Sequence, residues 1–304
     1  MRDADRESHR RGSSGEGFGM TWSLRYAPHL GYRPPFQPLF AATVGSEDPL
    51  EHIEFAADNG FAGVLYAAAR AHTAAQQQKV GEALAAHGLE AGCILYTTFD
   101  RLRNTSWATD GKEARAWIAG ELAQASEAAH RVGAKRLAVL GGADPQRPIP
   151  RQHAAFVQNL RHAGDIAARA GLTLCLETLS RKSIPDMLLQ HMPDAVAIAK
   201  AVNHPAVRLI FDTSHVQVMD GDLLFQLEQA WDHIEIVQLA DNPGRLEPGT
   251  GEINFESLLR RLSRRGYRGL VELEYGWRQP GPESESRGLA MLRRLDAAAS
   301  APSE

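Results

Sequence analysis

Cysteine and long apolar runs are both scarce in this sequence. Its 304 residues include 2 cysteines, Cys93 and Cys175, and both lie within apolar stretches typical of strands. A disulfide framework is therefore not expected, and a reducing cytoplasmic compartment fits this usage. We interpret both thiols as small buried hydrophobic groups. No apolar stretch approaches the ~20 residues of a membrane-spanning helix, so we expect no membrane partner.

The sequence also lacks a strong charge of either sign. Its formal net charge is −4, which argues against nucleic acid as the partner. The contents of 43% hydrophobic and 23% charged residues are those of an ordinary soluble globular protein. A chain of this length forms one or two domains, and α/β barrels of this size usually form one.

The two ends of the chain differ in composition from the rest. Residues 1–19 are charged, rich in Gly and Ser, and lack the apolar centre of a secretory signal. We expect a disordered tail there and a lead-in up to residue 37, with Met20 as an alternative start. Residues 299–304 are small and polar and are expected to fray. The folded domain is therefore predicted to span residues 38–298.

One local pattern recurs along the chain: a helix-like stretch, a glycine and then a short apolar run. Glycine directly after a helix adopts the left-handed conformation at little cost, so each such glycine marks a helix end. The apolar runs do not alternate strictly with polar residues, as expected for parallel strands buried on both faces. The predicted strands are 38–44, 61–66, 90–96, 136–140, 172–177, 207–212, 234–238 and 269–274.

Helical segments separate these strands. Asp48 and Pro49 open the first helix with a capping residue and a proline at the first helical position. The other helices are predicted at 72–87, 110–132, 151–170, 193–201, 221–231, 255–265 and 284–297. Eight alternating units predict a single-domain (β/α)8 TIM barrel. A doubly wound open sheet is the alternative, but no Gly-rich dinucleotide-binding fingerprint follows the first strand.

Four of the predicted strands end in a side chain that can bind a metal ion. These side chains belong to Glu177, Asp212, Gln238 and Glu274. In a barrel the carboxyl ends of the strands meet at one mouth, so the four groups converge. Three carboxylates at one point repel each other unless a cation lies between them. The pattern therefore predicts a metal site with acid–base chemistry.

Each of these residues also has a simpler interpretation. Glu177 could cap the following helix, and Asp212 could form an Asx turn. Glutamine is an uncommon ligand, and only its place between Asp212 and Glu274 in the strand order favours Gln238. Glu272 lies two residues before Glu274 and faces the same side of its strand, so it could lie one layer deeper in the barrel or at the rim.

Three further polar residues are predicted near this mouth. His215 follows Asp212 by three residues and is either structural or in contact with substrate or metal. Arg245 and Glu247 lie in a Gly/Pro-rich loop after the seventh strand, which could also be a flexible surface turn. Arginine suits a carboxylate or phosphate of a small substrate, held by two hydrogen bonds. We therefore favour substrate contact for Arg245 and Glu247.

Several of these segments resemble the hydroxypyruvate isomerase family, within the xylose-isomerase-like TIM barrels. The similar segments are Gln238 with the loop 240–254, the stretch from Phe211 to Gln217 followed by 221–223, and 273–275. The similarity is clear over about residues 133–275 and covers the N-terminal third only in general layout.

The resemblance implies a divalent metal ion, Mn²⁺ or Mg²⁺, and a homo-oligomer. The implied ligands are Glu177, Asp212, Gln238 and Glu274. It also implies that Glu177 and Glu274 form the acid/base pair and that His215 and Arg245 contact substrate oxygens. Some positions depart from the family pattern: Thr178 to Ser180, Ser214, Leu246, and Leu65 with Tyr66 at the end of the second strand. These positions would shape substrate choice.

The sequence therefore predicts a metal-dependent isomerase of a small α-hydroxy carbonyl acid or sugar, acting through an enediolate. The lead reaction is hydroxypyruvate to tartronate semialdehyde. The alternatives are a ketose 3-epimerase, a related sugar epimerase or dehydratase, and a non-catalytic sugar-binding barrel. A metal-dependent DNA endonuclease of the same fold is disfavoured by the negative net charge.

Overall fold

The structure, a computed structural model, describes residues 22–301. The predicted tail at 1–19 and residues 302–304 lie outside the described part. Parallel strands form a sheet in the order β1-β9-β8-β7-β6-β5-β4, and β2 pairs with β3. The strands are β1 Arg25–Pro28, β2 Gly63–Val64, β3 Glu90–Ala91, β4 Ile94–Leu95, β5 Arg136–Val139, β6 Thr173–Glu177, β7 Val207–Asp212, β8 Ile234–Leu239 and β9 Leu270–Leu273.

The sheet closes into a barrel through β1 and β2. The N–H groups of Ala62 and Leu65 donate to the carbonyls of Tyr26 and Pro28. Strands β3 and β4 are two halves of one barrel strand, which is interrupted at Gly92 and Cys93. β3 pairs with β2 and β4 pairs with β5, so nine short segments make the eight strands of a (β/α)8 barrel.

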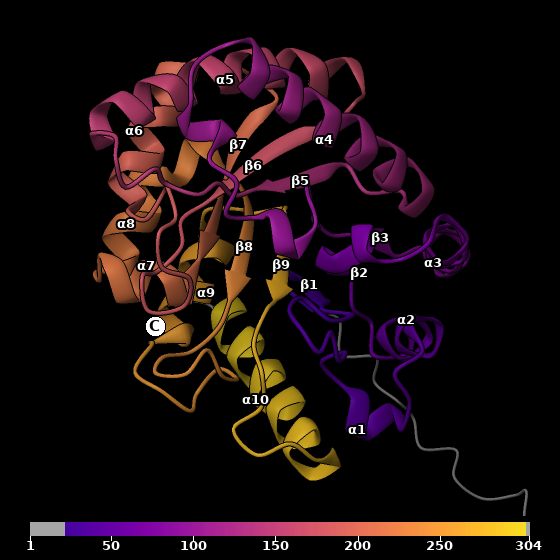
Figure 1. Ribbon diagram of the computed structural model, residues 1–304. Coiled ribbons are helices and arrows are strands. Elements are labelled where there is room, and N and C mark those ends of the chain that lie inside the picture. Colours follow the sequence, from indigo (N-terminus) through magenta and orange to yellow (C-terminus); the bar gives the residue numbers. More distant parts are fainter. Residues whose placement is uncertain (1–21, 302–304) are drawn as a thin grey trace, which may run out of the picture.

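Helices cover the outside of the barrel (Figure 1). They are α1 Ala41–Val44, α2 Pro49–Asp58, α3 Ala74–His87, α4 Lys112–Val132, α5 Ile149–Arg169, α6 Met192–Val202, α7 Thr213–Met219, α8 Leu223–Ala230, α9 Phe255–Arg264 and α10 Pro282–Ser300. Short 3-10 turns lie at Ala67–Ala71, Phe99–Arg101, Ser106–Ala108 and Trp231–His233. Helices α3 and α4 end at Gly88 and Gly133, whose φ angles of 65° and 79° confirm the predicted glycine caps.

The prediction of a first strand at 38–44 is wrong. This segment forms a turn and the short helix α1, and the first strand is β1. Strand β1 pairs with β9 and is anchored by Asp296 of α10, whose carboxylate accepts hydrogen bonds from Ser23 and the Tyr26 hydroxyl. Phe40 instead packs in an aromatic group with rings of the neighbouring elements. Hydrophobicity alone did not distinguish a strand inside the barrel from an apolar turn packed against aromatic rings outside it.

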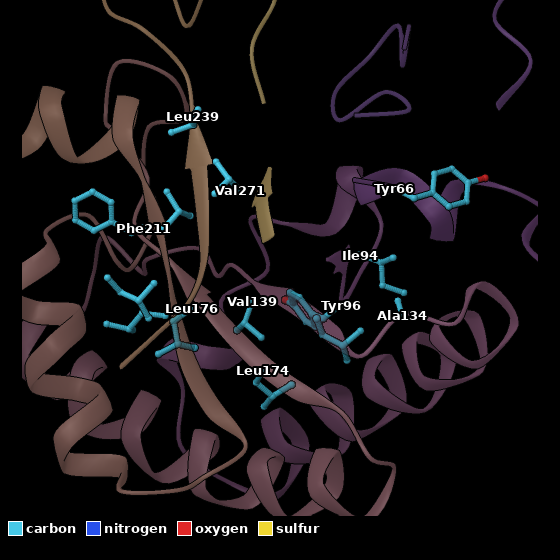
Figure 2. Close-up of a cluster of buried hydrophobic side chains, with 14 of the residues drawn as sticks. Tyr66, Ile94, Tyr96, Ala134, Val139, Leu174, Leu176, Phe211, Leu239 and Val271 are labelled. Carbon is cyan, nitrogen blue, oxygen red and sulfur yellow. The ribbon is translucent and has the colours of Figure 1, made fainter. Parts of the chain in front are cut away.

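The core has two layers. Alternate strand residues such as Val139, Leu176 and Phe211 point toward the helices (Figure 2). The residues between them point into the barrel, where Ala138, Cys175, Ile210 and Ile236 share a second cluster. Both cysteines are free and buried, as predicted. Among the residues that the structure describes, no helix is long and apolar enough to cross a membrane.

Candidate active site

The predicted strand-end residues converge at the mouth of the barrel. The residues two positions before them, Cys175, Ile210, Ile236 and Glu272, are all fully buried. Because side chains on a strand alternate between its two faces, Glu177, Asp212, Gln238 and Glu274 point into the barrel one layer above those residues. All four are buried. Ligand-type atoms of Glu177, Asp212 and His215 lie within 4.8 Å of one another.

Arg245 supplies the positive charge among these carboxylates. Its Nη2 lies 2.7 Å from Asp212 Oδ2 and 3.2 Å from Glu274 Oε1, and its Nη1 lies 3.2 Å from Asp212 Oδ1. This two-point contact with Asp212 is the strong geometry for an arginine–carboxylate pair. Arg245 is itself buried, so the pair lies away from bulk water. The loop that carries Arg245 therefore reaches back over the barrel, as predicted.

His215 lies at the same point. Asp212 caps α7 by accepting the His215 backbone N–H at 2.9 Å. This contact fixes the backbone from which the imidazole side chain extends. The ring places Nε2 3.1 Å from Arg245 Nη1 and 3.7 Å from Glu177 Oε1. Burial lowers the pKa of His215 to about 4, although Asp212 opposes this. The ring is therefore neutral near pH 7.

The carboxylates differ strongly in their environments. Burial raises the pKa of Glu177 well above its usual range, and Glu274 and Asp212 add to the shift. Burial also raises the pKa of Glu274 to about 8, against the opposing charge of Arg245. For Asp212 burial acts in the same direction, but Arg245 and His215 outweigh it and the pKa is lowered. Such unequal carboxyl groups are typical of acid–base sites.

A cavity of about 400 Å³ opens above these groups. Its polar end is formed by Glu177, His215, Gln238, Arg245 and Glu274. Its remaining wall is largely apolar and includes Leu95, Phe99, Leu102, Leu140, Leu179, Ile184 and Val218. Two exposed cations, Arg33 and Lys182, also line it. The cavity can hold a small polar molecule at its floor and has room for more atoms beyond it.

Glu247, which was predicted to contact substrate, does not line this cavity. Its Oε2 accepts the backbone N–H of Arg278 at 2.8 Å. The carboxylate is therefore occupied in joining its loop to the segment after β9. Asp212 also does not line the cavity, because Arg245 lies over it.

The structure adds two residues that the sequence patterns did not identify. Tyr32 lines the cavity and holds its ring 5.6 Å from the Arg245 guanidinium carbon. It lies in the segment predicted to be a lead-in, where no periodic pattern pointed to a site. Asp241 anchors the loop after β8, since its carboxylate accepts the N–H groups of Asn242, Gly249, Gly251 and Ile253. An acidic residue directly before a Gly-rich loop was the available signal.

Replacing Asp241 with asparagine is therefore expected to destabilise the protein and loosen the loop that carries Arg245. Each carboxylate oxygen of Asp241 accepts two backbone N–H groups, so an amide NH₂ in either place of the two leaves two of the four donors without their acceptor. The cost is about 1–3 kcal/mol for each donor that is buried, as those of Asn242 and Ile253 are, and smaller for the exposed Gly249 and Gly251. Urea unfolding of the variant and the parent measures the loss. An unchanged unfolding free energy would show that the loop does not depend on this carboxylate.

The donor set of the site fits a divalent cation. Two buried oxygens, Gln238 Oε1 and Glu274 Oε2, have no hydrogen-bond partner. Buried polar atoms normally have hydrogen-bond partners, so two unpaired oxygens at one site indicate that a ligand or ion can bind there. With the carboxylates of Glu177 and Asp212 they supply hard oxygen donors of the kind that Mg²⁺ and Mn²⁺ prefer.

Comparisons with known proteins agree with the fold. The family model described as xylose isomerase-like TIM barrel matches residues 53–295, so the chain belongs to that family of barrels. Hydroxypyruvate isomerase from Escherichia coli is 31% identical over 239 residues, which are 76% of this chain and 89% of that protein. A 2-oxo-tetronate isomerase from Cupriavidus necator is 31% identical over 57% of this chain and 70% of its own length. Within the barrels, the chain thus belongs to the hydroxypyruvate isomerase family and is an isomerase.

Solved structures show the same architecture. A crystal structure described as AP endonuclease, family 2, from Brucella melitensis aligns with a TM-score of 0.73 and 27% identity, covering 89% of this chain and 98% of that one. A D-psicose 3-epimerase from Clostridium cellulolyticum aligns with a TM-score of 0.67 over 91% of this chain and 96% of its own. At 17% identity, the second likeness shows the fold alone.

Proposed function

We propose that this isomerase uses one divalent metal ion, Mn²⁺ or Mg²⁺, and acts on a small α-hydroxy carbonyl acid, with hydroxypyruvate as the lead substrate. The observation that carries the proposal is a set of buried oxygen donors, three of them at the cavity floor and that of Asp212 beneath Arg245, with two oxygens of the set lacking hydrogen-bond partners. Glu177, Asp212, Gln238 and Glu274 would hold the ion. When bound, it would supply Lewis-acid polarisation of the substrate's carbonyl and hydroxyl oxygens.

The protein's own groups then account for the proton transfers. Glu177 ends β6 and Glu274 follows β9, so two other strands lie between them and both carboxyl groups line the cavity. One would remove a proton from the carbon that bears the hydroxyl group, which leaves an enediolate. The other would return a proton to the former carbonyl carbon, while the hydroxyl proton passes to the former carbonyl oxygen. Hydroxypyruvate then becomes tartronate semialdehyde with no net change in atoms. Positioned acid–base groups typically contribute about 10²–10⁴-fold to a rate.

His215 and Arg245 would hold the substrate. The guanidinium already contacts the carboxylates of Asp212 and Glu274, and the neutral imidazole lies beside it. A cation held by those carboxylates would free Arg245 to bind the carboxylate of an acid substrate through two hydrogen bonds. The buried position of both groups limits competition from water for these contacts.

The second candidate is epimerisation of a ketose. The cavity of about 400 Å³ exceeds the needs of a three-carbon acid and has room for a longer sugar. The same two carboxyl groups would then return the proton to the opposite face of the same carbon. A dehydratase or a barrel that binds sugar without turnover has no observation of its own in its favour.

The proposal is tested by a substrate panel with protein stripped of metal by EDTA and then supplied with Mn²⁺ or Mg²⁺. The panel contains hydroxypyruvate, a 2-oxo-tetronate and a hexulose. We expect turnover of hydroxypyruvate or the tetronate only after metal is added. Equal turnover by the stripped protein would contradict the metal requirement, and turnover of the hexulose alone would favour the epimerase.

A further inference from the structure

The amide of Gln238 has two chemically different ends, and one of them is held. Its Nε2 donates to Glu272 Oε2 at 2.9 Å, while its Oε1 is buried without a partner. Only the oxygen end of an amide can bind a cation or accept a hydrogen bond. The group that decides which end faces the cavity therefore decides whether Gln238 is a ligand.

Glu272 is that group. It lies opposite Gln238 in the register of β8 and β9, and it is fully buried at the level of apolar residues that include Cys93, Cys175 and Ile210. Its Oε1 accepts the Cys93 N–H at 2.7 Å, and its Oε2 accepts the Cys93 thiol at 3.2 Å in addition to Gln238. All three contacts are donated to Glu272, so both of its oxygens act as acceptors here and its Oε2 faces the amide's NH₂ end.

The barrel strand formed by β3 and β4 is interrupted beside the Glu272 carboxylate. The break between β3 and β4 falls at Gly92 and Cys93, and the Cys93 N–H points to Glu272 instead of to a neighbouring strand. A Cβ at Gly92 would lie 2.5 Å from Glu272 Oε1. The glycine and the interrupted strand together fix the position of Glu272, which in turn fixes the amide.

We propose that Glu272 is a positioning residue that holds Gln238 with Oε1 directed into the active site as a metal ligand. This inference rests on the metal site of the proposed function. Groups that orient metal ligands typically change metal affinity by about 10–100-fold when they are replaced. Glu272→Gln should weaken metal binding by a factor of that size. The new amide can place an NH₂ group against Nε2 of Gln238, so the Gln238 amide would flip and direct its NH₂ end into the active site.

A double-mutant cycle read by calorimetric titration with Mn²⁺ tests the inference. The cycle uses the EDTA-stripped parent, Glu272→Gln, Gln238→Met and the double variant. We expect Glu272→Gln to weaken Mn²⁺ binding by about 10–100-fold in the parent. It should have no further effect when residue 238 is Met, because there is then no amide to orient. Glu272→Leu serves as a second replacement that offers Gln238 no side-chain hydrogen-bond acceptor, and it is expected to weaken Mn²⁺ binding only when residue 238 is Gln.

The matched control is Glu285→Gln. Glu285 is also a buried glutamate that accepts backbone N–H groups, those of Ala42 and Thr43, but it lies on α10 outside the barrel. Its replacement should leave Mn²⁺ affinity unchanged. If Glu272→Gln binds Mn²⁺ as tightly as the parent does, the inference is overturned. It is also overturned if Glu272→Gln weakens Mn²⁺ binding equally with Gln or Met at position 238, because that result indicates a simple effect of charge. Absence of Mn²⁺ binding by the parent would contradict the proposed function itself.

Discussion

Replacing Glu177 or Glu274 with glutamine is expected to lower kcat by about 10²–10⁴-fold, the contribution typical of general acid–base catalysis. Both side chains line the cavity, and both have raised pKa values, first because of burial. A glutamine of the same shape keeps an oxygen donor but can neither remove nor return a proton. Steady-state rates on the best substrate of the panel, at saturating Mn²⁺, measure the effect.

Two features make this result informative. Glu285→Gln removes a buried carboxylate elsewhere and controls for general damage. Mn²⁺ affinity, measured in parallel, separates the loss of a ligand from the loss of a proton carrier. Parental kcat in either variant at saturating metal would remove that residue from the proposed acid/base pair.

Replacing Arg245 with methionine is expected to destabilise the metal-free protein by about 3–5 kcal/mol, the usual cost of leaving a buried charge without its partner. The guanidinium contacts Asp212 and Glu274, and all three side chains are buried. Mn²⁺ should recover much of the loss, because the ion can replace the missing positive charge; binding at 100 times its Kd contributes about 2.7 kcal/mol. Urea unfolding with EDTA and with Mn²⁺ measures both effects.

The control for this experiment is Arg260→Met. Arg260 pairs with Glu256 on the surface of α9, one turn away and partly exposed. Such pairs contribute about 0–1 kcal/mol. If metal-free Arg245→Met were as stable as the parent, Arg245 would not be the charge that compensates the carboxylates. If saturating Mn²⁺ does not raise the unfolding free energy of Arg245→Met toward that of the parent, the ion does not replace the positive charge of Arg245.

The strand-end residues could be predicted because two simple rules locate them. Glycine caps marked the helix ends before five strands, and apolar runs alone gave the strands that end at Asp212 and Gln238, so seven of the eight strands were located. The topology of a barrel then brought Glu177, Asp212, Gln238 and Glu274 to one mouth. These inferences needed only local sequence and the parallel arrangement of the strands.

The remaining features depend on contacts between distant segments. Strand β1 is defined by its pairing with β9 and by Asp296, which lies about 270 residues later in the chain. The contact of Arg245 with Asp212 depends on how the loop folds back, and the environment of Glu272 depends on an interruption at Gly92. For Glu272 the sequence left two positions open, a deeper layer or the rim, and the structure places it in the deeper layer.

The most direct test of the account is proton NMR of the substrate in D₂O with enzyme and Mg²⁺, beginning with hydroxypyruvate. The account predicts deuterium at a carbon next to the carbonyl group, incorporated only when metal is present and lost in Glu177→Gln. Deuterium at the former carbonyl carbon of the product indicates isomerisation, and deuterium at the original carbon with inverted configuration indicates epimerisation. Turnover that leaves no deuterium at the former carbonyl carbon or at the original hydroxyl-bearing carbon would contradict the account. A proton carried by these carboxyl groups is expected to exchange with D₂O before it returns to carbon.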